Sequence, residues 1–246
     1  MTAVRKVAQP LDGPLARVEA VDWAAASDAL DAQGYAVLRR VFDAAACAEA
    51  QSFYAREDLF RSRVVMARHG FGMGEYQYFS YPLPRLIDEL RHALYERLAP
   101  VANAWGERLG VDERYAATLD GFLKRCHARG QRRPTPLLLK YGAGDYNRLH
   151  QDLYGGVQFP LQAAVLLSAP GVDFDGGEFV LTETAPRRQT RAEVVPLGQG
   201  DMVIFAVNHR PVKSAKGFSR VAMRHGVSTI RRGSRMTLGI IFHDAT

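Results

Sequence analysis

The stretch LLLKYGAGDYNRLHQD, residues 137 to 152, marks the point at which the character of the chain changes. An apolar run, a Gly-rich turn and a second short run follow one another, which predicts two strands joined by a turn. His150 and Asp152 stand two residues apart, and residues at i and i+2 of a strand share one face. An imidazole and a carboxylate at one point favour a divalent metal, although an edge strand with polar side chains facing water has the same pattern.

Beyond this stretch the chain continues as short β-type runs, separated by Gly, Pro, Asn and Asp. These runs are LQAAVLLS, GEFVLTE, AEVVPL, DMVIFAV, SRVAMRHGVSTI and MTLGIIFH. Many short strands at this spacing indicate a sandwich or jelly roll. We therefore expect residues 137–246 to form a jelly roll, that is, a double-stranded β-helix.

Residues 1–136 have mostly helical patterns instead. VDWAAASDALDAQG has apolar residues at helical spacing and stops at Gly34, and Asp43 is the expected N-cap of the next helix. PRLIDELRHALYERLAPVANAWGERLG predicts one or two long helices, broken or kinked at Pro100. Because helices and strands are segregated along the chain, we predict an α+β fold in which an N-terminal helical layer buttresses one sheet of a single compact unit.

Composition limits the class of protein. The chain has 246 residues, is 47% hydrophobic and has no apolar stretch of membrane-spanning length. Its first twenty residues lack the apolar core of a secretory signal, and two cysteines do not make a disulfide framework, so a cytoplasmic protein is expected. The net charge is +6, and residues 187–235 hold eleven Lys or Arg against two acidic residues. Such a region attracts polyanions such as nucleic acid, or is simply a solvated basic face.

A third metal ligand is expected from a later strand. HGVSTIRRGSRMTLGIIF supplies His225 and, ten residues on, Arg235 at the start of an apolar run. Two His and one carboxylate form the facial triad of non-haem Fe(II) oxygenases, and an Arg beside the second His suits a carboxylate clamp. His209, directly after DMVIF, is the rival third ligand, but it has no Arg at the same offset.

Taken together, these motifs resemble the 2-oxoglutarate- and Fe(II)-dependent dioxygenase superfamily. The resemblance covers LLLKYGAGDYNRLHQD, GGEFVLTE, VVPLGQGDMVIF and HGVSTIRRGSRMTLGIIF, in that order. It implies Fe(II) held by His150, Asp152 and His225, 2-oxoglutarate with its far carboxylate on Arg235, and O2 as the oxidant. From about Gly34 the chain also resembles a bacterial family described as oxygenases acting on damaged nucleic acid, through GFGMGEYQYFSYPLP, RPTPLLLKYGAGDYN and RHGVS.

Two further positions follow from the resemblance and its limits. Tyr141 matches the tyrosine that lines the co-substrate pocket in prolyl-hydroxylase-like members. Thr237 faces the same side as Arg235, where it either contacts the co-substrate carboxylate or packs as a β-branched residue. In alkylation-repair members a second Arg follows the first by six residues, whereas this chain has Ile241 there. The full repair-type site is therefore absent.

The stretch ARHGFGMGEYQYFSYPLP, residues 67–84, is rich in aromatic residues and glycine. It is interpreted either as a mobile lid, with Tyr76, Tyr78 and Phe79 on the substrate, or as packing between the helical layer and the jelly roll. If the substrate is nucleic acid, basic side chains of residues 187–235 are expected at the mouth of the site. The four expected there are Arg187, Arg191, Arg210 and Lys213.

Three functions remain open on the sequence alone. The first is a 2-oxoglutarate-dependent oxygenase that hydroxylates or oxidatively demethylates alkylated nucleic acid. The second is the same oxygenase acting on a small molecule, an amino acid or a protein side chain. The third is a cupin-like module that binds a metal without redox chemistry, which has no need of a carboxylate clamp at Arg235.

Overall fold

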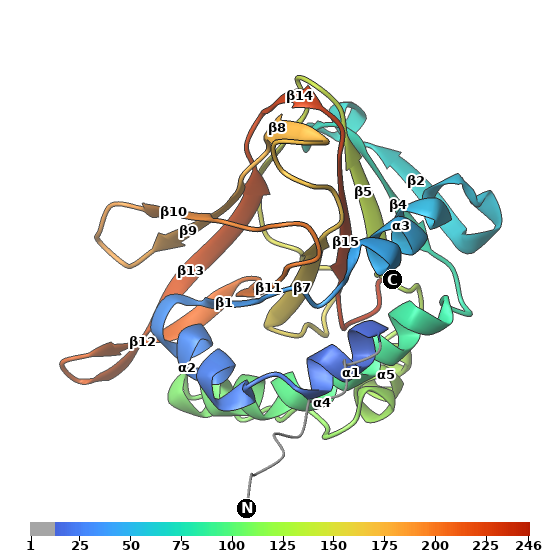
Figure 1. The fold of residues 1–246 in the computed structure, drawn as a ribbon. Coiled ribbons are helices and arrows are strands. Elements are labelled where there is room, and N and C mark those ends of the chain that lie inside the picture. Colours follow the sequence, from blue (N-terminus) through green and yellow to red (C-terminus); the bar gives the residue numbers. More distant parts are fainter. Residues whose placement is uncertain (1–12) are drawn as a thin grey trace, which may run out of the picture.

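The computed structural model describes residues 13–246, and the expectations placed on residues 1–12 lie outside it. Two antiparallel sheets face each other, and a layer of helices runs along one side of them (Figure 1). The five helices are α1 (Gly13–Glu19), α2 (Trp23–Gln33), α3 (Ala44–Ser52), α4 (Arg85–Arg108) and α5 (Leu119–Ala128). Within residues 13–246 no helix is long and apolar enough to cross a membrane.

The larger sheet has seven strands in the order β1-β11-β7-β15-β5-β4-β2. Their bounds are β1 (Tyr35–Leu38), β11 (Met202–Ala206), β7 (Leu161–Leu166), β15 (Arg235–Ile240), β5 (Leu137–Tyr141), β4 (Glu75–Phe79) and β2 (Phe60–Val65). Strands β7 and β11 are buried at every position, because the sheet is covered on both faces.

The smaller sheet has the order β10-β9-β13-β6-β3, and β12 also pairs with β13. Its strands are β10 (Arg191–Val195), β9 (Phe179–Thr184), β13 (Gly217–Val227), β6 (Tyr146–His150), β3 (Gly72–Met73) and β12 (His209–Ser214). A separate pair, β8 (Phe174–Gly176) and β14 (Ile230–Gly233), lies at the top of the molecule in Figure 1. Two facing antiparallel sheets form the jelly-roll core.

The larger sheet separates two apolar layers. Side chains on its outer face, such as Leu138, Val165 and Ile240, belong to the main core together with residues of α2, α4 and α5. Side chains on its inner face, such as Ala164 and Phe205, pack toward the smaller sheet. This alternation follows from the two-residue period of a strand, and it leaves the functional side chains between the two sheets.

Local sequence rules locate several element ends. Gly34 ends α2 in the left-handed conformation, and the Asp43 side chain accepts a hydrogen bond from the Ala46 N–H at the start of α3, as predicted. Pro100 does not divide the long helix, because α4 runs through it from Arg85 to Arg108.

Residues before 137 contribute strands as well as helices: β1, β2 and β4 join the larger sheet and β3 the smaller one. Of the two interpretations of residues 67–84, the mobile lid therefore does not fit β3 and β4, which are strands of the two sheets. Strand β4 pairs with β2 on one side and β5 on the other, so its backbone is part of the sheet.

Candidate metal centre and co-substrate pocket

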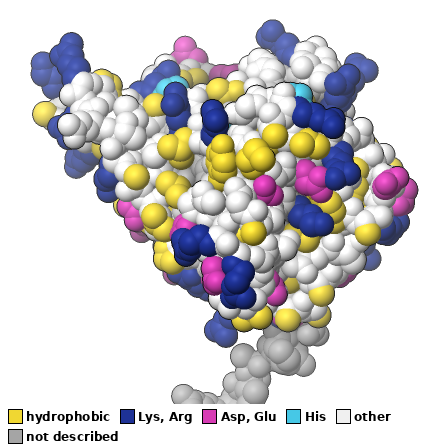
Figure 2. All heavy atoms as spheres, turned by 90° about the horizontal axis from the view of Figure 1, so that it is seen from above, with side chains coloured by type: hydrophobic (Ala, Val, Ile, Leu, Met, Phe, Trp, Pro, Cys, Tyr) yellow, Lys and Arg dark blue, Asp and Glu magenta, His cyan; other side chains and the backbone are white. Residues whose placement is uncertain are grey.

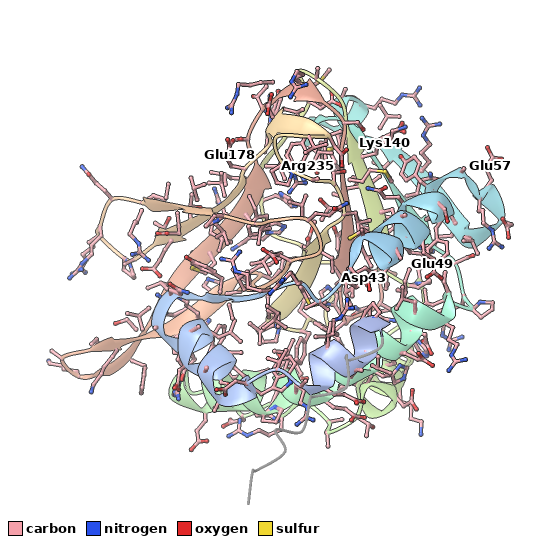
Figure 3. The ribbon with its side chains drawn as sticks, viewed as in Figure 1. Asp43, Glu49, Glu57, Lys140, Glu178 and Arg235 are labelled. Carbon is pink, nitrogen blue, oxygen red and sulfur yellow. The ribbon has the colours of Figure 1, made fainter. Side chains whose placement is uncertain are left out.

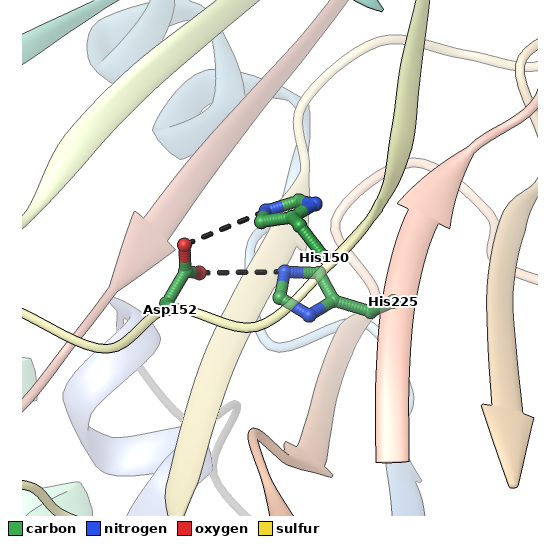
Figure 4. A group of neighbouring side chains, drawn as sticks. All are labelled: His150, Asp152 and His225. Carbon is green, nitrogen blue, oxygen red and sulfur yellow. Dashed lines mark ion pairs between the residues drawn. The ribbon is translucent and has the colours of Figure 1, made fainter. Parts of the chain in front are cut away.

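Three side chains predicted as ligands meet between the sheets (Figure 4). His150 ends β6, Asp152 follows two residues later, and His225 lies on β13 directly opposite His150. One ligand atom from each lies within 4.8 Å of the other two, and the described residues contain no other such group. The rival ligand His209 lies on β12, outside this group.

The distances within the group suit one ion. His150 Nε2 lies 3.4 Å from Asp152 Oδ1, and His225 Nε2 lies 3.3 Å from Asp152 Oδ2. Adjacent ligands on an octahedral ion with bonds of about 2.1 Å stand about 3 Å apart, so the group needs little adjustment to bind one. His150 Nδ1 donates to the Arg148 carbonyl at 2.7 Å, which leaves Nε2 free for a metal.

Burial and charge prepare the carboxylate for this role. Burial by itself would raise the pKa of Asp152, but the hydrogen bonds and charges of the two histidines hold it well below its usual value. The pKa of His225 is lowered, first by burial and then by the charge of His150. A carboxylate and a neutral imidazole are the forms that bind a metal ion. The His225 ring also packs against Phe205, at 4.6 Å between ring centroids.

A bulge between β6 and β13 brings a further residue inward. His225 pairs with His150 and Val227 pairs with Asn147, so two steps on β13 oppose three on β6. The extra residue in β6 turns both Asn147 and His150 toward the cavity, whereas residues three apart in a regular strand face opposite sides. Asn147 Nδ2 donates to the Tyr141 hydroxyl at 3.3 Å. Strand alternation alone does not reveal this position.

Arg235 lies at the start of β15, paired in register with Tyr141 on β5, and Figure 3 shows it near Glu178. Its side chain is fully buried, and Nη1 donates to Thr237 Oγ1 at 2.6 Å. Its Nε has no hydrogen-bond partner, and no carboxylate among residues 13–246 forms an ion pair with it. Burial lowers the pKa of Arg235 to about 10, against weaker opposing effects of Tyr141 and Glu178. A buried cation without an anion is costly, so this site is suited to an anionic ligand.

Two glycines make room for this pocket. A Cβ on Gly177, where φ is +61°, would lie 2.9 Å from Arg235 Cδ. A Cβ on Gly74, where φ is +110°, would lie 2.8 Å from the Tyr141 ring. Gly177 and Gly74 therefore permit close packing around Arg235 and Tyr141.

One cavity of about 380 Å³ connects the triad, Arg235, Thr237 and Tyr141. Tyr76 lines it from β4, and Gln162 lines it from β7 with Oε1 buried and unpaired. The lining of this cavity fits Fe(II) and 2-oxoglutarate. Three suitable metal ligands, those of the triad, converge beside the buried Arg235 side chain, which has no ion-pair partner among the described residues. Sequence reasoning did not single out Asn147, Gln162 or Tyr154, which have no motif of their own.

Two expected substrate residues on β4 lie elsewhere. Phe79 is wrong as a substrate contact, because its side chain is fully buried in the main core against Phe53 and Phe60. Tyr78 is also buried, beneath the Arg61 guanidinium, and does not line the cavity.

The expectation for Arg210 is also wrong. It forms a buried ion pair with Glu183 and donates to the Asp31 carbonyl. Arg187 and Arg191 belong to the β9–β10 hairpin and Lys213 to the β12–β13 hairpin, and none of them lines the cavity. On the face in Figure 2, Lys and Arg side chains are dispersed among acidic and apolar ones. The basic side chains that do line the cavity are Arg148 and Arg235.

Solved structures with the same fold include a Pseudomonas putida prolyl-4-hydroxylase, with a TM-score of 0.53 and 18% identity over 88% of this chain and 96% of that one. Another is an oxidoreductase of the 2OG-Fe(II) oxygenase family from Burkholderia pseudomallei, with a TM-score of 0.53 and 17% identity over 92% and 94%. At these identities the likeness concerns the fold. The jelly roll, the His-Asp-His triad and the buried Arg beside it together define the class of Fe(II)- and 2-oxoglutarate-dependent oxygenases.

Within that class, the chain belongs to the family described as "oxygenase, catalysing oxidative methylation of damaged DNA", whose model matches residues 74–245. A related chain in the curated proteins is the uncharacterized protein Rv2227 of Mycobacterium tuberculosis strain H37Rv. It is 48% identical over 167 residues, which are 68% of this chain and 72% of that one. Residues 74–245, which the family model matches, include all three triad members and Arg235.

Proposed function

We propose that this protein is an oxygenase that uses Fe(II), 2-oxoglutarate and O2 to hydroxylate a substrate C–H bond. One observation carries the proposal: Arg235 is buried without an ion-pair partner among the described residues, in the same cavity as the metal triad. A protein that only binds a metal gains nothing from such a charge, so the observation counts against a cupin-like module without redox chemistry.

Each group has a defined task in this proposal. His150, Asp152 and His225 hold the metal on one face, and Arg235 with Thr237 and Tyr141 holds the far carboxylate of 2-oxoglutarate. The bound iron and 2-oxoglutarate supply the oxidising power for the hydroxylation. The apolar side chains around the triad, among them Phe205, keep water from the reacting group.

Alkylated nucleic acid is the first candidate substrate. The family description names damaged DNA, and the net charge of the chain is +6. Phe71, which is 49% exposed, lines the cavity and stacks on His69 with 5.3 Å between ring centroids. An exposed aromatic stack beside the cavity suits a base, and Arg148 beside it suits a phosphate. Hydroxylation of an N-methyl group would release formaldehyde and leave the demethylated base.

A small molecule, an amino acid or a protein side chain is the second candidate. The observation that favours it is the cavity wall, which is mainly apolar and has Arg148 and Arg235 as its basic residues. A mostly apolar pocket with few polar contacts is typical of small-molecule sites. The absence of Arg187, Arg191, Arg210 and Lys213 from this wall removes the support that we expected from them for a nucleic acid.

Turnover of 2-oxoglutarate tests the class of reaction. With Fe(II) and O2, the protein should convert 2-oxoglutarate to succinate, and His225→Ala should abolish this conversion. The reaction should be stimulated by either methylated oligonucleotides or a metabolite pool. A protein that binds the metal but never consumes 2-oxoglutarate would contradict the proposal.

Salt dependence separates the two substrate classes. Phosphate contacts release counterions, so affinity for a methylated oligonucleotide should fall steeply between about 50 and about 200 mM salt. Arg148→Gln should reduce the slope of log affinity against log salt concentration by about one. Arg210 is unsuitable as a control, because its replacement would disrupt the buried ion pair with Glu183. A flat response, or no binding, would favour the small-molecule or protein substrate.

A further inference from the structure

Tyr154 touches the metal triad although no motif draws attention to it. Its hydroxyl donates to Asp152 Oδ1 at 2.6 Å. The same oxygen faces His150 Nε2 at 3.4 Å, while Oδ2 faces His225 Nε2 at 3.3 Å. With one lone pair of Oδ1 occupied by a strong hydrogen bond, Oδ2 is the better oxygen for a cation.

The backbone of Tyr154 is itself held in place. Gln131 is fully buried, and its Nε2 lies within hydrogen-bonding distance of three carbonyl oxygens, those of Tyr154 and Val157 at 2.9 Å and that of Asp244 at 2.6 Å. Its Oε1 accepts the Val157 N–H at 2.7 Å. Between them, Gly155 has a φ of +105°, and a Cβ there would lie 2.5 Å from Gln131 Cδ. The loop after Asp152 is thus closed around one glutamine, which fixes the direction of the Tyr154 side chain.

The Tyr154 ring is also packed on two sides. It meets Tyr78 edge to face, with 6.2 Å between ring centroids, and lies 5.9 Å from the His243 ring. These contacts hold the hydroxyl against the carboxylate, to which it donates.

We propose that Tyr154 is a positioning residue, which holds Asp152 so that a single carboxylate oxygen, Oδ2, binds the metal. This inference rests on the proposed function, because it takes the triad as the iron site. A carboxylate that binds through one oxygen leaves more of the metal's coordination positions for 2-oxoglutarate and O2. Without the hydroxyl, Oδ1 is free to turn toward the metal.

The test is Tyr154→Phe, which removes the hydroxyl and keeps the ring between Tyr78 and His243. Co(II) is the probe, because its absorption spectrum reports coordination number and its binding requires no turnover. We expect the Co(II) affinity to fall by about 10- to 100-fold, as is typical when a hydrogen bond to a ligand is lost. The spectrum of the Co(II) protein should change as well, which a loss of stability alone would not produce.

Tyr76→Phe is the matched control. Tyr76 lines the same cavity, and no hydrogen bond joins it to the triad within residues 13–246. Its variant should keep the wild-type Co(II) affinity and spectrum. The unfolding midpoint of each metal-free variant shows whether the fold persists.

The outcomes separate this inference from the function on which it rests. If the wild type does not bind Co(II) at the triad, both are wrong. If the wild type binds Co(II) and Tyr154→Phe binds it with equal affinity and the same spectrum, the function stands and the role of Tyr154 is overturned. A Tyr154→Phe variant that does not fold would assign Tyr154 to stability and overturn its role as well.

Discussion

The Arg235 guanidinium is a buried charge that the rest of the described chain leaves without a counter-ion. We expect Arg235→Met to bind 2-oxoglutarate about 30-fold or more weakly, because a buried charged hydrogen bond is lost. At about a hundred times its Kd, 2-oxoglutarate should stabilise the Co(II)-bound wild type by about 2.7 kcal/mol and the variant by far less.

Thermal unfolding with and without 2-oxoglutarate measures this difference. Arg224→Met is the control, since Arg224 is an exposed residue of the same strand that carries His225. An equal shift of the unfolding midpoint in Arg235→Met and Arg224→Met would show that Arg235 does not hold the co-substrate. Metal binding should be nearly the same in both variants.

His243 makes the stability of the metal-free protein depend on pH. The side chain is buried, its Nδ1 accepts the Phe159 N–H at 3.3 Å, and burial lowers its pKa to about 4. Because the folded-state pKa is below the unfolded value of about 6.5, the neutral ring favours folding above pH 6.5. That contribution is lost as the pH falls from about 6.5 to about 4.

The full loss in the free energy of unfolding is on the order of 3 kcal/mol, because each unit of difference between the folded and unfolded pKa corresponds to about 1.4 kcal/mol. His243→Asn offers an acceptor to Phe159 but does not titrate in this range. Denaturant unfolding at several pH values should therefore show a steeper decline for the wild type than for the variant between pH 6.5 and 4. Parallel curves would mean that His243 is not the group responsible.

At the scale of elements, substitutions in and near β4 show whether residues 75–79 are held in the sheet or form a mobile lid. Phe79 is fully buried, with its ring 4.6 Å from that of Phe60, whereas Phe71 in the same aromatic stretch is 49% exposed. Phe79→Ala should lower the free energy of unfolding by about 3–5 kcal/mol, as for other buried phenylalanines.

Phe71→Ala should change the free energy of unfolding by less than about 0.5 kcal/mol, since Phe71 is exposed at the surface and lies outside the core. Urea unfolding of both variants measures the contrast. Similar, small losses for both would mean that residues 75–79 are not held in the sheet, and would revive the mobile-lid interpretation.

Elements with local causes were predictable from the sequence. Gly34 and Asp43 end and begin helices through bonds to residues three or four positions away, so their roles are encoded nearby. The triad and Arg235 were predictable as neighbours because their spacing and residue types are specific to one chemistry.

Elements with distant partners were not predictable in this way. The glycines around residue 74 suggested mobility, but Gly74 is required because the Tyr141 ring lies against it. Arg210 suggested a phosphate contact, but its partner Glu183 is on another strand, and no local pattern reveals that ion pair. Tyr154 is only two residues from Asp152, yet its role depends on a loop that Gln131 closes from far away in the chain.

At the scale of the whole molecule, one buried ion pair joins the helical layer to the end of the larger sheet. Arg91 of α4 pairs with Asp244 at 2.8 Å, and its other nitrogens donate to the Ile241 carbonyl and the Tyr81 hydroxyl. Both charged side chains are almost fully buried. Arg91→Met leaves Asp244 without its main partner, which should lower the free energy of unfolding by about 3–5 kcal/mol.

Removing both charges should be less damaging than the sum of the single changes. Arg91→Met with Asp244→Leu leaves no unpaired charge, so the two substitutions should show a favourable coupling of about 1 kcal/mol or more. Denaturant unfolding of the four proteins of this double-mutant cycle measures the coupling. Additive losses would mean that the two side chains are not paired in solution.

The unpaired charge at Arg235 also has a consequence for the lifetime of the protein. Proteases cleave transiently opened molecules, and a ligand that binds only the folded state lowers the opened fraction in proportion to its occupancy. A cell rich in 2-oxoglutarate would then keep the protein longer as well as supply its co-substrate, so abundance would follow central carbon metabolism. Limited proteolysis should slow when 2-oxoglutarate and a metal are added, and Arg235→Met should need about 30-fold or more 2-oxoglutarate for the same protection.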